Sequence, residues 1–151
     1  MADTLTLGWI GLGKMGLPIS TRLAGAGRDI AGFDRDPESV RVSIANREEN
    51  GIADEAVAFH HAGLEEGFRL TGRADVVLAN IISDVLCIYA DNLVDSVSPG
   101  GVLALSGILA KEQDAVRAHF EAKCQAAWGA GTRSDGRIMG EWSDVALFRP
   151  L

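Results

Sequence analysis

The sequence predicts an α/β fold, in which a mostly parallel sheet carries helices on both faces. Short apolar runs alternate with longer segments of helical periodicity along almost the whole chain, and this alternation is typical of parallel strands joined by crossover helices. The run 75–82 is apolar with little interruption, as expected for a strand buried on both faces. At 151 residues, the chain has room for one domain with a sizeable core.

Local signals place the elements of the first half of the chain. Asp36 can cap a helix with its carboxylate, and Pro37 suits the first helical position because proline has no N–H to leave unpaired there. Residues 63–70 are ambiguous. In chain order, the expected elements are the strand 5–10, the helix 17–26, the strand 30–34, the helix 37–50 and the strand 56–59.

The second half follows the same alternation until its last residues. In chain order, we expect the strand 75–82, a helix from Ser83 or Asp84 to Val97, the strand 102–105, the helix 111–123 and the strands 125–131 and 141–148. Pro99, Gly100 and Gly101 should end the first of these helices. The polar stretch 132–140 is too short for a crossover helix, so the last two strands should pair antiparallel.

A glycine-rich turn follows the first predicted strand. The segment Gly11-Leu12-Gly13-Lys14-Met15-Gly16 has the GxGxxG spacing of dinucleotide-binding sites and opens a helical segment. Gly11 allows the sharp turn, Gly13 leaves room for a bound pyrophosphate, and Gly16 lets the helix lie close to the sheet. Asp34 closes the second strand roughly 20 residues further on, where such folds place the carboxylate that binds a ribose.

Charge and composition exclude several classes of partner. The net charge of −7 and the absence of a Lys or Arg cluster argue against nucleic-acid binding. No apolar stretch approaches the ~18 residues of a membrane span, and the first residues lack the pattern of a secretory leader, so a cytoplasmic protein is expected. Cys87 and Cys124 should be reduced thiols. His60 and His61 lack further ligands at metal-binding spacing, and we expect no metal site.

Residues 5–34, and above all the run 9–20, resemble the start of β-hydroxyacid dehydrogenases of the hydroxyisobutyrate type. This resemblance implies an NAD site, with Asp34 and Arg35 beside the ribose. Asp34 would repel the 2′-phosphate of NADP, although Arg35 weakens that preference. The implied cofactor contacts in the turn are Gly11, Leu12, Gly13, Lys14, Met15 and Gly16.

From about Asp34 onward, the chain instead resembles the ribosomal-protein methyltransferases that modify a stalk protein of the large subunit. The resemblance implies a three-layer, Rossmann-like, doubly wound sheet in methyltransferase-type order, with seven strands and an antiparallel last pair. It also makes Asn80 a cofactor contact and a weak catalytic candidate near the methyl acceptor, although Asn80 could equally cap a strand end. The motifs that carry it are Asp36-Pro37, 46–51, 79–82, Pro99-Gly100-Gly101, 105–109 and Glu141-Trp142.

The two resemblances meet near Asp34, at a point that both families share in topology. We therefore interpret the chain as a recombined one, natural or made in a laboratory. In this interpretation, a dehydrogenase-like segment, 1–34, joins a methyltransferase-like segment, 35–151, within a single domain. A single natural family that has diverged is the alternative.

Two polar anchors for S-adenosylmethionine are missing, which favours NAD as the coenzyme. The first strand ends in Gly8-Trp9-Ile10 without an acid, and residues 61–64 read His-Ala-Gly-Leu where the methyltransferase resemblance implies Gly-Asp. S-adenosylmethionine stays the alternative coenzyme.

The sequence shows no counterpart of the domain with which either family completes its reaction. The main hypothesis is therefore a nucleotide-coenzyme-binding module that holds NAD at most and turns over nothing. The alternatives are an S-adenosylmethionine-binding, methyltransferase-like domain and a structural chimera without a ligand. The oligomeric state is left open.

Overall fold

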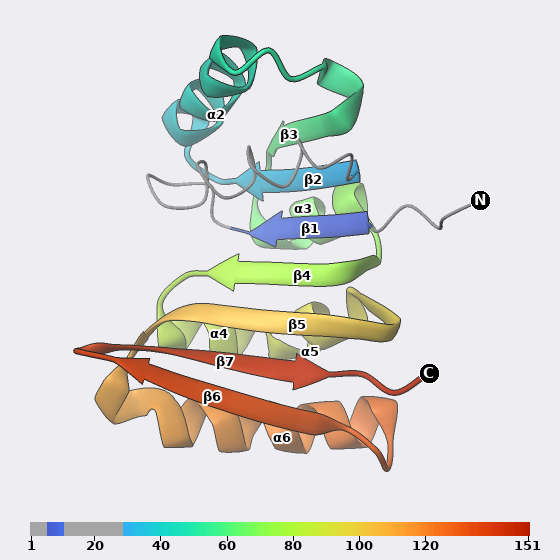
Figure 1. The fold of residues 1–151 in the computed structure, drawn as a ribbon, viewed down its shortest axis with the longest axis vertical. Helices are drawn as coiled ribbons and strands as arrows, with labels where there is room; N and C mark the ends of the chain where they lie inside the picture. Colours follow the sequence, from blue (N-terminus) through green and yellow to red (C-terminus); the bar gives the residue numbers. More distant parts are fainter. Residues whose placement is uncertain (1–5, 11–28) are drawn as a thin grey trace.

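In the computed structural model, which describes residues 6–10 and 29–151, seven strands form one sheet in the order β3-β2-β1-β4-β5-β7-β6 (Figure 1). The strands β1 to β5 are parallel to one another, whereas β7 is antiparallel to both β5 and β6. This confirms the predicted α/β class and the antiparallel last pair. The strands are β1 (Thr6–Ile10), β2 (Asp29–Asp34), β3 (Val57–His61), β4 (Ala74–Asn80), β5 (Val97–Leu109), β6 (Arg133–Met139) and β7 (Trp142–Phe148).

Helices lie on both faces of this sheet, and each face has its own core. Alternate residues of a strand point to opposite faces, so Phe33 and Val77 belong to the larger core under α3 to α6, whereas Leu7 and Ile30 belong to a smaller core under α2. The helices are α2 (Pro37–Glu49), α3 (Leu64–Thr71), α4 (Ser83–Ile88), α5 (Ala90–Asp95) and α6 (Gln113–Trp128), with single 3₁₀ turns at Asp54–Ala56 and Ala110–Glu112.

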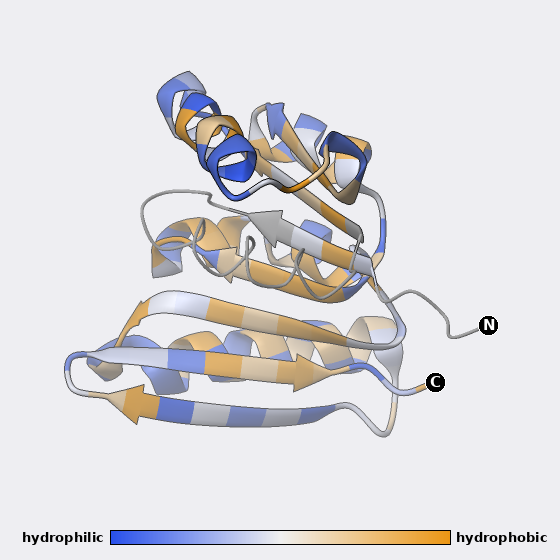
Figure 2. Cartoon of the chain, turned by 45° about the horizontal axis from the view of Figure 1, so that its top comes forward, coloured by the Kyte–Doolittle hydropathy of each residue, from blue (hydrophilic) through white to orange (hydrophobic). Residues whose placement is uncertain are grey.

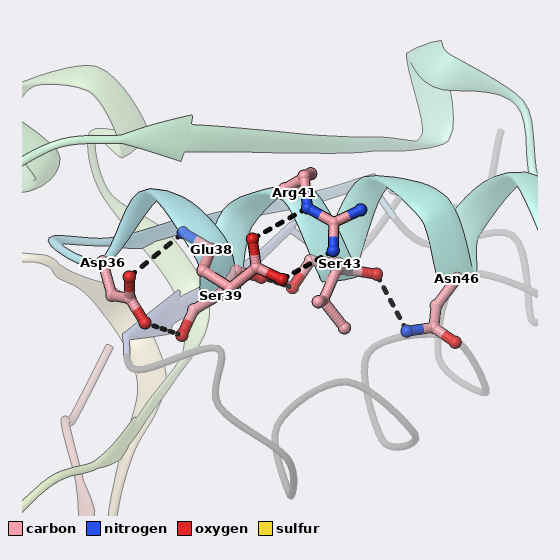
Figure 3. Close-up of polar contacts among 7 residues, drawn as sticks. Asp36, Glu38, Ser39, Arg41, Ser43 and Asn46 are labelled. Carbon is pink, nitrogen blue, oxygen red and sulfur yellow. Dashed lines mark hydrogen bonds and ion pairs between the residues drawn. The ribbon is translucent and has the colours of Figure 1, made fainter.

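The helix α2 starts as predicted and is tied to β3 by a buried arginine. The Asp36 carboxylate accepts hydrogen bonds from the Glu38 N–H and the Ser39 hydroxyl, both at 3.0 Å, as Figure 3 shows. At the other end of the helix, Arg47 donates to the Val57 carbonyl at 3.0 Å and pairs with Asp54 at 2.8 Å. These bonds fix where the chain leaves β2 and where it enters β3.

The first strand of the antiparallel pair lies elsewhere than predicted. The helix α6 continues to Trp128, so the strand expected at 125–131 is wrong, and β6 occupies most of the stretch expected to be a polar turn. Arg133, Asp135 and Arg137 alternate along β6 and are all exposed to solvent, and Figure 2 shows this edge strand rich in hydrophilic residues. An edge strand with so little buried surface has no apolar alternation to detect.

The segment between β4 and β5 also differs from the prediction. The helix expected over 83–97 is divided at Tyr89, whose backbone has φ −101° and ψ 20°, into α4 and α5. The strand β5 begins at Val97 and runs through Pro99 and Gly100. This is possible because Val97 pairs with Ala74 before a register shift in the β4–β5 ladder, and Gly100 adopts φ 77° within it.

Replacing Asp75 by alanine is expected to lower the free energy of unfolding by about 1.5 kcal/mol at pH 7, the low end for hydrogen bonds to a charged group. The Asp75 carboxylate accepts from the Thr6 N–H at 2.7 Å and from the Thr6 hydroxyl at 2.8 Å, and these bonds hold the pKa of Asp75 below its usual value. A lowered pKa in the folded state stabilises the protein above the unfolded pKa of about 3.9, and this contribution is lost as the pH falls below it.

Urea unfolding at pH 7 and at pH 3 checks this expectation. The difference between the wild type and Asp75→Ala should shrink at pH 3. Thr6→Val, which removes the hydroxyl and keeps the N–H, should lower the free energy of unfolding by less than Asp75→Ala does. A difference of the same size at both pH values would contradict the assigned role of the charge.

Candidate functional site

A cavity of about 320 Å³ opens at the carboxyl edge of the sheet, beside the ends of β2 and β4. We call it the edge cavity. The chain order reverses around β1, which lies between β2 and β4, and ligands of open α/β sheets bind at such a switch point. The edge cavity is lined by Phe33, Asp34, Arg35, Ala62, Leu64, Ile81, Ile82 and Val85.

Asp34 is the only carboxylate among the described residues that line the edge cavity. It ends β2, and its Oδ1 atom accepts a hydrogen bond from the Asp36 N–H at 2.9 Å. The Asp34 carbonyl accepts from the Ala62 N–H at 3.1 Å, which ties the loop after β3 to the end of β2. On the next residue, the Arg35 carbonyl lies 3.2 Å from Nε2 of His61. The acid is therefore held at the cavity by bonds from two loops.

The first turns of α2 keep the chain after Asp34 in place. Hydrogen bonds from the Glu38 N–H and then from the Ser39 hydroxyl hold the pKa of the Asp36 carboxyl below its usual value. Arg41 pairs with Glu38 at 2.6 Å on the exposed side of the helix (Figure 3). The charged form of Asp36 thus satisfies the free N–H of Glu38 at the start of α2 and fixes the direction in which the chain leaves β2.

Asn80 lies at the same edge of the sheet but lines a different cavity. It ends β4, pairs in register with Ser106 of β5, and borders a second cavity of about 310 Å³ together with Ser106 and Asp144. An added Cβ atom on Gly107, which has φ 78°, would lie 2.9 Å from Asn80 Oδ1. The glycine thus allows the bulged part of β5 to come close to the Asn80 amide.

Of the residues predicted to contact a cofactor, the structure brings Asp34 and Arg35 together at the edge cavity and leaves Asn80 outside its lining. Gly11, Leu12, Gly13, Lys14, Met15 and Gly16 lie outside the described residues. The apolar walls of the edge cavity were not predicted from the sequence. For Ile81 and Ile82, the sequence does carry a signal, because both directly follow a buried strand at the edge where ligands bind. Leu64 falls in a stretch that was ambiguous in the sequence.

Other chemistry is scarce in the described part of the chain. Cys87 and Cys124 are free thiols, and burial raises the pKa of Cys124 to about 12, which keeps it protonated and unreactive. Within residues 6–10 and 29–151, no group of three or more His, Cys, Asp or Glu side chains could hold a metal ion. None of the helices described has the length and apolar composition that crossing a membrane requires.

The comparisons with known proteins identify the family. The sequence model described as ribosomal protein L11 methyltransferase (PrmA) matches residues 8–138. The chain belongs to the PrmA family. The L11 methyltransferase of Citrifermentans bemidjiense is 44% identical over 111 residues, which are 74% of this chain and 35% of that protein. The enzyme of the same name from Pelobacter propionicus is 38% identical over 133 residues, covering 88% of this chain and 40% of that protein. The chain thus spans little more than a third of the length of these PrmA relatives.

Solved structures share the fold. The crystal structure of ribosomal protein L11 methylase from Lactobacillus delbrueckii subsp. bulgaricus has a TM-score of 0.76 at 22% identity, and covers 100% of this chain and 73% of that chain. An RNA methyltransferase from Salinibacter ruber, in complex with S-adenosyl-L-homocysteine, has a TM-score of 0.67 at 21% identity and covers 97% of this chain and 81% of that one. The methyltransferase-type strand order predicted from the sequence is confirmed.

The PrmA assignment corrects three predictions. The match includes residues on both sides of Asp34, so the recombined chain, with a dehydrogenase-like segment 1–34 joined to 35–151, is wrong. The preference for NAD and the hypothesis of a module that holds NAD at most are wrong too, because the family consists of methyltransferases. A glycine turn after the first strand and an acid after the second serve any coenzyme that presents ribose hydroxyls there, so these motifs do not distinguish the two coenzymes. The resemblance to ribosomal-protein methyltransferases is confirmed.

Proposed function

We propose that this chain forms a single Rossmann-like domain that binds S-adenosylmethionine and carries the methyl-transfer site of a protein methyltransferase. The observation that carries the proposal is the edge cavity, which combines one carboxylate at the end of β2 with apolar walls in a chain of the PrmA family. The relatives are named ribosomal protein L11 methyltransferases. A ribosomal protein of the L11 type is accordingly the proposed methyl acceptor.

The cavity fits the adenosine part of this coenzyme. Its volume of about 320 Å³ lies at the lower end of the range for small-molecule sites. Leu64, Ile82 and Val85 offer apolar surface to a flat base, and Asp34 offers acceptors to a ribose diol. A carboxylate has about four acceptor positions, and the bond from the Asp36 N–H fixes the orientation of the group. When bound, S-adenosylmethionine supplies an activated methyl group on its sulfonium.

The remaining predicted contacts complete the proposal. The glycine turn, residues 11–16, directly follows β1 and stays a prediction for a third wall, because glycine lets the backbone come close to a ligand. Arg35 lines the cavity beside Asp34. Asn80, at the end of β4, stays a candidate for orienting the methyl acceptor. The segment Gly8-Trp9-Ile10 ends β1 without an acid, so Asp34 has a large share in holding the coenzyme.

Replacing Asp34 by alanine is expected to weaken binding of S-adenosyl-L-homocysteine by about 10- to 100-fold. Each hydrogen bond between a ribose hydroxyl and a charged acceptor contributes about 1.5 to 3 kcal/mol, and 1.4 kcal/mol corresponds to a tenfold change in affinity. Isothermal titration calorimetry measures the affinity, and thermal unfolding shows whether the variant stays folded.

Asp34→Asn, which keeps one acceptor oxygen and loses the charge, is the matched control. Its affinity for S-adenosyl-L-homocysteine should lie between those of the wild type and Asp34→Ala. NAD should not bind to any of the three proteins. Unchanged affinity in Asp34→Ala would contradict the assigned ribose contact, and a wild-type protein that does not bind S-adenosyl-L-homocysteine would overturn the proposed function. Mass spectrometry of ribosomal protein L11 after incubation with the protein and S-adenosylmethionine tests the acceptor.

A further inference from the structure

A glycine lies within the helix α3, at a position where the local backbone conformation does not require one. Gly67 is the fourth residue of this eight-residue helix, is buried, and has an ordinary right-handed backbone. In a helix interior, glycine is less favourable than alanine, because its backbone loses more conformational freedom on folding. Some contact outside the helix must therefore favour the absence of a side chain at this position.

That contact is the ring of Phe33. A Cβ atom added to Gly67 would overlap Cγ, Cδ2 and Cε2 of Phe33, far inside van der Waals distance. Three atoms along one side of the ring are affected, so a rotation of the ring tip cannot remove the overlap. Phe33 is 2% exposed, and the Phe68 ring meets it edge to face with centroids 5.6 Å apart. The Phe33 ring is thus held against the bare backbone of α3.

The same ring lines the edge cavity. On its buried side, Phe33 belongs to the larger core together with Val77 and Ala79, and a packed core has little empty volume to receive a displaced ring. The helix is restrained as well, because the Ala62 N–H just before α3 donates to the Asp34 carbonyl. The empty space next to the ring is the edge cavity itself.

We propose that Gly67 is a positioning residue that sets the depth of the edge cavity. Because Gly67 has no side chain, the Phe33 ring can pack directly against α3, which leaves the cavity deep enough for the base of the coenzyme. Gly67 does not touch the ligand and acts through Phe33. The inference rests on the proposed function, because the occupant is the adenine of S-adenosylmethionine.

The test is Gly67→Ala, titrated with S-adenosyl-L-homocysteine and separately with adenosine in a calorimeter. We expect both ligands to bind at least tenfold more weakly, by the same factor, because the displaced ring takes the space of the base. The matched control is Gly63→Ala, next to the same helix. Gly63 has φ −69° and ψ 167°, and an added Cβ atom there meets nothing within 4 Å, so affinity should not change.

A rescue variant separates positioning from a general loss of structure. In the background of Phe33→Ala, which removes Cγ and the whole ring, adding Gly67→Ala should leave affinity within about threefold, because the atoms that the added Cβ would overlap are absent. This comparison holds even if Gly67→Ala alone does not fold. The inference is overturned if Gly67→Ala binds like the wild type, or if Phe33→Ala does not suppress its effect. If the wild type and Asp34→Ala both fail to bind, the proposed function fails instead, and the inference with it.

Discussion

Phe120→Ala is expected to lower the free energy of unfolding by about 3 to 5 kcal/mol, the usual cost of truncating a buried phenylalanine. Phe120 lies in the middle of α6, is 0% exposed, and belongs to the larger core together with Leu103 of β5 and Leu147 of β7. The loss would be a large share of the roughly 5 to 15 kcal/mol that stabilises such a domain. Urea denaturation followed by circular dichroism measures it.

Phe59→Ala is the matched control for this prediction. Phe59 is only partly buried and packs against the smaller core on the other face of the sheet. Its replacement removes the same atoms but leaves less of a cavity, so the loss should be clearly smaller. Equal losses of stability in the two variants would contradict the expectation that the deeper burial of Phe120 makes its truncation more costly.

Gly107→Ala is expected to cost roughly 2 to 4 kcal/mol of stability and to disturb Asn80. A residue other than glycine at φ 78° is strained by about 1 to 2 kcal/mol, and overpacking typically adds 1 to 3 kcal/mol. The added Cβ atom would lie 2.9 Å from Asn80 Oδ1 and 3.0 Å from the Ile81 carbonyl oxygen. The Asn80 side chain must turn away from the added atom, whereas the Ile81 carbonyl belongs to the backbone and can move only together with the chain after β4.

Gly51→Ala separates the strain from the overlap. Gly51 has φ 65°, and an added Cβ atom meets nothing within 4 Å, so this variant carries the backbone strain alone. Thermal unfolding should rank Gly107→Ala as the less stable of the two. The opposite ranking would show that the contact between Gly107 and Asn80 yields easily.

Elements with local signals could be predicted from the sequence. Asp36 and Pro37 mark the start of α2, because capping is a property of a few consecutive residues. The strand β4 could be recognised from its apolar run, and the structure ends it at Asn80 because Ser83 already begins α4.

Elements that depend on distant pairing could not be predicted in the same way. The strand β6 is held to β7 along a continuous ladder from Arg133 to Met139, although none of its side chains is buried. Likewise, β5 runs through Pro99 and Gly100, which normally end a strand, because its first residue pairs with Ala74. Pairing over such separations overrides local preference.

In the candidate site too, the residue with a local signal could be predicted and the residues brought together by the fold could not. Asp34 could be found because it directly ends an apolar strand at a fixed distance from a glycine turn. The walls Ala62, Leu64 and Val85 come from the segments that follow β3 and β4, and only the order of the strands brings them to Asp34. The identity of the coenzyme could not be read from the glycine spacing, because different nucleotide coenzymes present the same ribose to the same acid.

The reversed direction of β7 has a practical consequence. The strand β1 begins, and β7 ends, at the amino edge of the sheet (Figure 1). Asp34 and the edge cavity lie at the opposite edge, where β2 ends. A tag or tether attached after Leu151 would therefore leave from the side facing away from the cavity mouth. Immobilising the protein through that end on a sensor chip should keep the mouth clear for titration with small ligands.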